Sequence, residues 1–332
     1  MEIIILGGGN FVWSVLSWAK TQAYACSAIT NSEQAEKRLT STGLCFRQTL
    51  DSNGIPYVIT ETPEGLNVWS NVESTGEPLL LSYGAPWIIK KGILENVFRN
   101  KLLNIHGTRL PRERGGTLFS WQILSGQRTG MALIHKMTEK LDEGPIVAHE
   151  EFIYPASCRK PIDYLAFYEE KNLEFLKAFI QSFQNVPHQL LAQPEYLSTY
   201  WPRLLASVHG WINWSWSVTE IERLICAFDD PYAGARCRWN NMIVLIKDTW
   251  AQATDGYTHP FQNGLVYRNN NKWINVAANG GELLICRITD LDGNDILPQF
   301  KTGDRLYTLP TDLTQSYQRV VKTKQGLIPK SF

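Results

Sequence analysis

Residues 2–9 of the chain read EIIILGGG, and this stretch decides the fold class. The run of isoleucines predicts a buried strand, and the glycines after it permit a tight turn. An apolar pattern with helical spacing follows from Phe11 to Trp18. A strand, a turn and a helix in this order are typical of an α/β domain. The glycines lack the G-x-G-x-x-G spacing of a dinucleotide site, so they indicate the turn and not the ligand.

Strand-like and helix-like segments alternate over the next part of the chain. Strands are predicted at 25–30, 57–60, 78–82, 102–105, 130–136 and 145–152, and helices at 32–39, 90–96 and 161–184. This alternation indicates a mainly parallel sheet with helices on both faces.

The pattern changes after residue 185. Residues 185–205 are rich in Pro and Gln and are typical of a linker, and a short helix at 218–226 follows. Brief strands at 242–246, 264–267, 272–275 and 283–287, separated by Gly and Asn turns, predict a small β-barrel. The chain of 332 residues is also long enough for two cores. We therefore expect a domain at 1–185, a linker at 186–205 and a second domain at 206–332.

Charge and cysteine usage exclude several classes of protein. Lys plus Arg and Asp plus Glu both number 32, and residues 201–332 hold 14 basic and 12 acidic residues, which disfavours a large nucleic-acid partner. The six cysteines are scattered without metal-ligand spacing, which indicates a reducing cytoplasm and no metal site. With no signal-peptide pattern and no run of 18 apolar residues, we expect a cytoplasmic protein that does not enter a membrane.

Polar residues gather around the strand predicted at 102–105. Asn104 and His106 are two apart, so their side chains emerge on one face at the carboxyl end of a parallel strand, where open α/β sheets place their sites. A long loop rich in Gly and Pro follows, and Asp142 lies in a turn between two predicted strands. The alternative interpretation is structural, since Asn-x-His can cap a turn and Asp before Gly is ordinary turn chemistry.

These three residue types suit acyl transfer to an amine. The Asn104 amide can donate to the oxygen that becomes negative in the tetrahedral intermediate. His106 can take the proton of the attacking nitrogen, and Asp142 can orient the imidazole and stabilise its charged form. An amine attacks directly, so no serine or cysteine nucleophile is needed.

The same segment resembles a known family. Residues 104–116 read NIHGTRLPRERGG, followed by Trp121, Gly126, Gly130, His135 and then DEGPI at 142–146. This order of motifs is similar to that of the folate-dependent formyltransferases, which include methionyl-tRNA formyltransferase and sugar-nucleotide N-formyltransferases. Motifs between 212 and 235 resemble the C-terminal domain of the longer members. The resemblance implies a Rossmann-type formyltransferase domain, a smaller OB-like domain and N10-formyltetrahydrofolate as the formyl donor, with no metal.

The resemblance also assigns site residues beyond Asn104, His106 and Asp142. It implies that the folate is bound by Ser82, Tyr83, Gly84, Ala85, Trp87, Ile88, Leu141, Glu143 and Gly144. It implies that the acceptor side is formed by Thr108, Arg109, Leu110, Pro111, Glu113, Arg114, Gly115 and Trp121. The family commonly has Ser at Thr108 and Tyr or Asn at Glu113, and these departures put the acceptor in doubt. Glu113 is expected to pair with an acceptor amine or with a basic loop neighbour, or to be solvated.

Three acceptors remain open from the sequence. The balanced charge favours the amine of a nucleotide-linked amino sugar, on the path to a surface glycan, over the methionyl group of initiator tRNA. An amino acid or peptide-synthesis intermediate is the third option. A member that only binds folate or a sugar nucleotide is disfavoured, because all three catalytic candidates are present. The assembly is open, with a homodimer as one option.

Overall fold

The computed structural model describes residues 1–68, 77–253, 258–323 and 326–330. The chain forms two compact units, and both are discontinuous in sequence. The first unit consists of Met1–Arg114, Gly130–Phe152 and Tyr168–Tyr200, and the second of Gly115–Thr129, Ile153–Phe167 and Trp201–Phe332. The domain bounds expected from the sequence, 1–185 and 206–332 with a linker at 186–205, remain a proposal.

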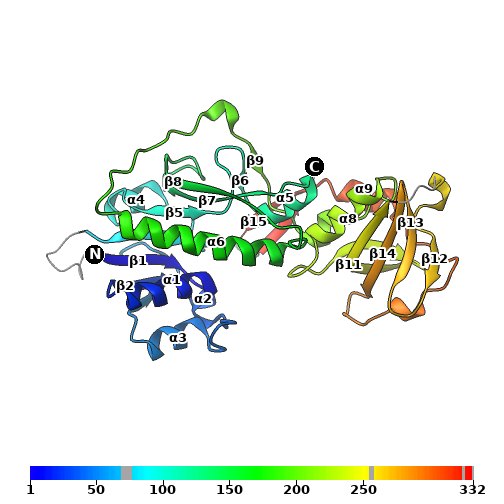
Figure 1. Ribbon diagram of the computed structural model, residues 1–332, viewed down its shortest axis with the longest axis horizontal. Helices are drawn as coiled ribbons and strands as arrows, with labels where there is room; N and C mark the ends of the chain where they lie inside the picture. Colours follow the sequence, from blue (N-terminus) through cyan, green and yellow to red (C-terminus); the bar gives the residue numbers. More distant parts are fainter. Residues whose placement is uncertain (69–76, 254–257, 324–325, 331–332) are drawn as a thin grey trace. The chain divides into compact units, whose positions relative to one another are not determined.

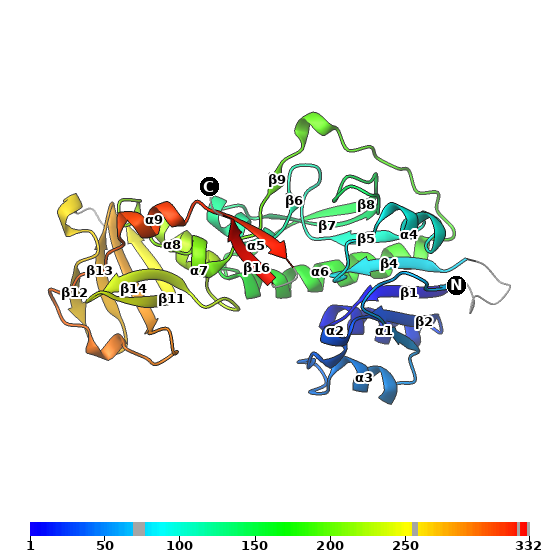
Figure 2. The ribbon, with the colours of Figure 1, turned by 180° about the vertical axis from the view of Figure 1, so that it is seen from behind.

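The helices and strands follow one another along the chain as drawn in Figures 1 and 2. Up to residue 153 they are β1 (Glu2–Gly7), α1 (Asn10–Thr21), β2 (Ala25–Thr30), α2 (Ser32–Glu36), α3 (Phe46–Ser52), β3 (Tyr57–Ile59), β4 (Leu79–Tyr83), α4 (Lys91–Asn96), β5 (Leu103–His106), β6 (Arg114–Gly115), α5 (Leu118–Ser125), β7 (Thr129–Lys136) and β8 (Ile146–Ile153). Beyond it they are α6 (Pro161–Ser182), η1 (Glu195–Leu197), β9 (Tyr200–Trp201), α7 (Ala206–His209), α8 (Val218–Ala227), β10 (Ala235–Trp239), β11 (Met242–Ala253), η2 (Pro260–Gln262), β12 (Val266–Asn269), β13 (Ile274–Ala278), β14 (Gly281–Thr289), η3 (Leu297–Gln299), α9 (Pro310–Gln315), β15 (Arg319–Thr323) and β16 (Gly326–Lys330).

The first unit is built on a seven-stranded sheet in the order β3-β2-β1-β4-β5-β7-β8. The five strands from β3 to β5 are parallel, and β7 joins β5 antiparallel. The mainly parallel α/β fold predicted from the sequence is therefore confirmed.

The alternation of β1 side chains divides the core of this unit in two. Ile3 and Ile5 pack in one cluster with apolar residues of α1 and α6, whereas Ile4 and Leu6 pack in another with residues of α4. Successive strand side chains point to opposite faces, so the isoleucine run fills both cores. Helices thus cover both faces of the sheet, which leaves its carboxyl end for the site.

Gly7 shows why glycine follows β1. Its φ is +138°, and a Cβ built there would lie 2.0 Å from the Tyr83 carbonyl oxygen of β4. Only glycine combines this conformation with such a close approach of two backbones. The packing of β1 against β4 thus accounts for Gly7 without a bound phosphate.

The second unit contains an antiparallel sheet in the order β10-β11-β14-β13-β12. Helix α8 begins at a capping box formed by Ser217 and Glu220. Its apolar side chains, among them Ile221 and Ile225, are fully buried, and the helix packs on β11 and β14. The separate antiparallel sheet predicted for the C-terminal part is therefore confirmed.

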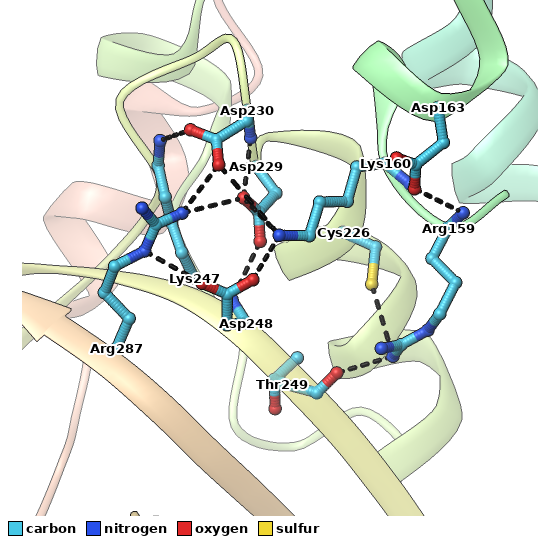
Figure 3. Close-up of polar contacts among 10 residues, drawn as sticks. All are labelled: Arg159, Lys160, Asp163, Cys226, Asp229, Asp230, Lys247, Asp248, Thr249 and Arg287. Carbon is cyan, nitrogen blue, oxygen red and sulfur yellow. Dashed lines mark hydrogen bonds and ion pairs between the residues drawn. The ribbon is translucent and has the colours of Figure 1, made fainter. Parts of the chain in front are cut away.

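A cluster of charged residues lies at the end of α8 (Figure 3). We call it the Asp229 cluster, and its members are Lys160, Asp229, Asp230, Lys247, Asp248 and Arg287. The Asp229 carboxylate is buried and lies 3.4 Å from Lys160 Nζ and 3.3 Å from an Arg287 nitrogen. It also accepts hydrogen bonds from the backbone N–H groups of Asp230 and Asp248, at 2.6 and 2.8 Å.

The charges of this cluster compensate one another. Asp230 contacts Lys247 Nζ at 2.6 Å and an Arg287 nitrogen at 2.8 Å. Burial raises the pKa of Asp230, but the hydrogen bonds from Lys247 and Arg287 outweigh it and hold the pKa at about 2. The cluster joins the end of α8 to β11 and β14, so we interpret it as structural.

Among the described residues, none of the helices combines the length and the apolar composition that a membrane crossing requires.

Candidate active site

The polar residues expected from the sequence meet at the carboxyl end of β5. Asn104 and His106 belong to β5, and β7 places His135 opposite Asn104. Asp142 comes from the loop between β7 and β8, and its Oδ1 lies 3.7 Å from His106 Nδ1 and 3.8 Å from His135 Nε2. The side chains of His106, His135 and Asp142 are 8%, 3% and 9% exposed. The structure thus brings two imidazoles, a carboxylate and an amide together in a largely buried site.

His135 orients the Asn104 amide. Its Nδ1 lies 2.9 Å from the Lys136 carbonyl oxygen, which can only accept, so Nδ1 carries a proton. Burial, followed by the nearby His106, lowers the pKa of His135 to about 4, so the ring is neutral at pH 7 and Nε2 is an acceptor. The contact of 3.1 Å between Asn104 Nδ2 and His135 Nε2 is therefore donated by Asn104. The amide keeps a second N–H for another acceptor.

Thr108 defines the tautomer of His106. The Thr108 hydroxyl donates its single hydrogen to the Glu113 carbonyl oxygen at 2.8 Å. Its oxygen lies 2.9 Å from His106 Nε2 and must accept there, so Nε2 carries a proton. In the neutral ring Nδ1 is then the basic atom, and it faces Asp142. A threonine supplies this hydroxyl as well as the serine that the family commonly has.

His135 had no role in the sequence-based prediction, although it is part of the motif order. Its partnership with Asn104 depends on the register of β5 against β7, which neither strand's own pattern specifies. The sequence did contain a signal for His135, because it is a polar residue that directly follows four hydrophobic ones. Met131 to Ile134 are all buried.

His106, His135 and Asp142 also lie close enough together to hold a metal ion. Within the described ranges they form a group whose nitrogen and carboxylate oxygen atoms lie within 4.8 Å of one another. A metal on His135 Nε2 would displace the hydrogen bond from Asn104. The absence of a metal in the reaction therefore stays a prediction, and a chelator tests it.

The residues predicted to bind folate lie partly beside this cluster. Ser82 pairs with Asn104 across β4 and β5 and is buried, and the Tyr83 hydroxyl donates to Glu169 at 3.2 Å. Beyond Gly84 and Ala85, Trp87 Nε1 is buried without a hydrogen-bond partner in the described parts of the chain. Ile88 is 90% exposed. Contacts of these residues with folate remain predictions.

The other three predicted folate residues surround Asp142. Leu141 is exposed, and the Glu143 carboxylate lies 3.2 Å from Lys140 Nζ. Gly144 has no room for a side chain, because a Cβ there would lie 1.8 Å from the Lys136 carbonyl oxygen. Gly144 therefore fixes how closely the Asp142 turn approaches β7.

The residues predicted for the acceptor side separate into two groups. Arg109 and Glu113 form an ion pair at 3.0 Å, so Glu113 has the basic loop neighbour that the sequence offered as one option. Leu110, Pro111 and Arg114 are buried beside them. Gly115 and Trp121 belong to the second unit, where the Trp121 indole donates to the Pro202 carbonyl at 2.8 Å. Their roles toward an acceptor remain predictions.

Two family models match the chain. The model described as "Formyl transferase" matches residues 79–155, and "Formyl transferase, C-terminal domain" matches residues 205–301. The first match includes Asn104, His106, His135 and Asp142, and the two together cover more than half of the chain.

Individual relatives agree with these matches. A methionyl-tRNA formyltransferase of Rickettsia bellii is 25% identical over 312 residues, which are 91% of this chain and 98% of that protein. Among solved structures, an N-formyltransferase from Helicobacter canadensis with folinic acid and dTDP-3-aminofucose is similar with a TM-score of 0.67 and 18% identity, covering 87% of this chain and all of that one.

A second solved structure, the sugar 3N-formyl transferase WlaRD with dTDP and 5-N-formyl-THF, gives a TM-score of 0.66 and 20% identity, covering 86% of this chain and 97% of that one. At these identities the structural likeness establishes the fold alone. Taken with the two family models and the site geometry, the comparisons show that the chain belongs to the formyltransferase family.

Proposed function

We propose that this chain transfers a formyl group from N10-formyltetrahydrofolate to the amine of a nucleotide-linked amino sugar. The observation that supports the proposal most is that two side chains of the site are each held in one state. His135 fixes the orientation of the Asn104 amide, and Thr108 fixes the tautomer of His106. Acyl transfer to an amine needs one hydrogen-bond donor for an oxyanion and one base for a proton, and this site offers both.

Asn104 stabilises the charge that develops on the formyl oxygen. As the acceptor nitrogen bonds to the formyl carbon, that oxygen gains a negative charge, and the second N–H of the Asn104 amide donates to it. A donor of this kind, held in advance by His135, contributes about 3–4 kcal/mol to transition-state stabilisation.

His106 moves the proton. Its Nδ1 takes the proton of the attacking amine, and the Asp142 carboxylate, 3.7 Å away, stabilises the resulting imidazolium. When the bond between the formyl carbon and N10 breaks, the proton passes to the departing nitrogen. The products are the formamide and tetrahydrofolate, and His106 returns to its neutral form.

The acceptor assignment is supported by charge and by the relatives. The chain has no net charge, whereas a tRNA-binding protein gains affinity from a basic excess. The two solved relatives carry dTDP or a dTDP amino sugar. Methionyl-tRNA formyl transfer is the second candidate, because the Rickettsia bellii relative matches over nearly its whole length.

A formyl-transfer assay that follows tetrahydrofolate release distinguishes these acceptors. The panel contains dTDP-, UDP- and GDP-linked amino sugars, methionyl initiator tRNA and free amino acids. We expect turnover with one nucleotide amino sugar and none with tRNA. Turnover with tRNA alone would overturn the acceptor assignment but keep the donor, and no turnover with any of them would contradict the proposal.

A further inference from the structure

The Asp142 turn depends on a contact from a residue outside the motifs described above. Asp142 adopts a φ of +55°, in the left-handed region that non-glycine residues occupy only when their surroundings hold them there. Its carboxylate nevertheless has to face two imidazoles at once. The backbone of this turn therefore needs an anchor.

Gln193 provides that anchor. Its Nε2 donates to the Asp142 carbonyl oxygen at 2.8 Å and to the Gly144 carbonyl oxygen at 2.7 Å. These two bonds use both hydrogens of one amide, and they bracket the turn on either side of Glu143. A single side chain thus fixes the backbone that carries the catalytic carboxylate.

Arg114 in turn fixes Gln193. The Gln193 Oε1 accepts from Arg114 Nε at 3.4 Å and from a terminal nitrogen at 3.1 Å. Arg114 is buried, and its other terminal nitrogen lies 3.0 Å from Glu195 and 3.7 Å from Glu143. Because a guanidinium only donates, the amide cannot turn over, and its N–H groups stay aimed at the Asp142 turn.

The surrounding segment is joined to the site by backbone hydrogen bonds. Leu191 and Ile146 exchange two bonds at 2.8 and 2.9 Å, and Thr199 bonds to Pro111 and Arg114 at 3.1 Å each. Residues 191–199 are therefore docked on the Asp142 turn and on the loop that follows His106, within the region that the sequence indicates as a linker.

We propose that Gln193, held by Arg114, is a positioning residue for Asp142, so that residues 191–199 are part of the catalytic apparatus. This inference rests on the proposed formyl transfer. In this proposal Arg114 orients Gln193, whereas the family resemblance placed Arg114 on the acceptor side.

The test compares Gln193→Glu and Gln193→Met with Gln189→Glu, which makes the same change at an exposed position just before this segment. The carboxylate of Gln193→Glu keeps the contact with Arg114 but cannot donate to the two carbonyls, and Met can do neither. We expect both variants to lower kcat by about 10–100-fold, the scale of a misplaced catalytic group, with KM values within about twofold. The loss should fall on kcat in both variants, because the carboxylate is no longer held beside the imidazole. Gln189→Glu should match the wild type.

A wild-type kcat in both Gln193 variants, even with a lower melting temperature, would overturn the positioning role. An inactive wild-type chain would instead contradict the proposed function. The positioning role is then tested without turnover, by NMR titration of the imidazole signals assigned with His106→Gln and His135→Gln. We expect the uncharged Gln193→Met to change these titrations, and unchanged titrations would overturn the positioning role.

Discussion

The two buried polar clusters of this chain differ in the kind of group that lies beside the buried carboxylate. In the second unit, the Asp229 carboxylate has two cationic neighbours within 3.4 Å and two backbone N–H donors. In the first unit, the Asp142 carboxylate lies 3.7 and 3.8 Å from two imidazole nitrogens. Lysine and arginine keep their charge and stabilise the fold, whereas an imidazole can gain or lose a proton near neutral pH and can take part in a reaction. The difference predicts opposite consequences of substitution in the two places.

The largest effect is expected on catalysis, from Asn104→Ala. This change removes the proposed donor to the formyl oxygen and should lower kcat by about 10²–10³-fold. It should leave the free energy of unfolding of the second unit unchanged. Steady-state formyl transfer together with urea unfolding measures both, and a kcat within about threefold of the wild type would remove Asn104 from the reaction centre.

The largest effect on stability is expected from Lys160→Met in the Asp229 cluster. Removing one partner of a buried charge costs about 3–5 kcal/mol, because the buried Asp229 carboxylate loses one of its two cationic neighbours. The control is Lys171→Met on α6, whose pair with the exposed Glu174 should contribute less than about 0.5 kcal/mol. Equal losses for both variants in urea unfolding would show that the Asp229 cluster is not special.

A smaller effect is expected from His135, which should make the free energy of unfolding depend on pH. Its pKa is about 4 in the fold, against the ordinary value of 6.5, so between these values the unfolded chain binds more protons. The contribution of His135 to the free energy of unfolding should therefore be fully present above about pH 6.5. It should be lost as the pH drops toward 4. His135→Gln should flatten this dependence in urea unfolding at several pH values, and the exposed His149→Gln should not. Identical profiles for both variants would contradict the neutral state of His135.

The smallest effect is expected from metal removal. Because His135 Nε2 already accepts from Asn104, dialysis against a chelator should leave kcat within about twofold of its starting value. A large loss that is restored by one added divalent ion would show that His106, His135 and Asp142 hold a metal.

Much of the fold could be predicted because it depends on local periodicity. The strand at 2–6 and the helix at 161–184 appear as β1 and α6 with nearly the expected bounds. Strand β10 also has a readable pattern, since buried residues at 235, 237 and 239 alternate with Arg236 and Arg238, but it was not predicted. Helix α5 is short, mixes Ser and Gln with its apolar residues and begins without a side-chain cap, so its sequence carries little helical signal.

The contacts between distant segments could not be predicted. The strand predicted at 242–246 runs to Ala253 as β11, and the charged Lys247 and Asp248 within it belong to the Asp229 cluster. His135 and Gln193 likewise gain their roles only from tertiary pairing. Asn104, His106 and Asp142 could be singled out because their residue types suggest the chemistry before the fold is known.

The most direct test makes the same substitution in both clusters and measures kcat and the free energy of unfolding for each. Asp142→Asn should lower kcat by at least about 100-fold, since it removes the charge that stabilises a protonated His106, and should change stability little. Asp229→Asn should lower stability by several kcal/mol and leave the kcat of the folded protein near that of the wild type. If Asp142→Asn keeps normal formyl transfer, or if Asp229→Asn loses it while folded, the assignment of the reaction to Asn104, His106 and Asp142 is wrong.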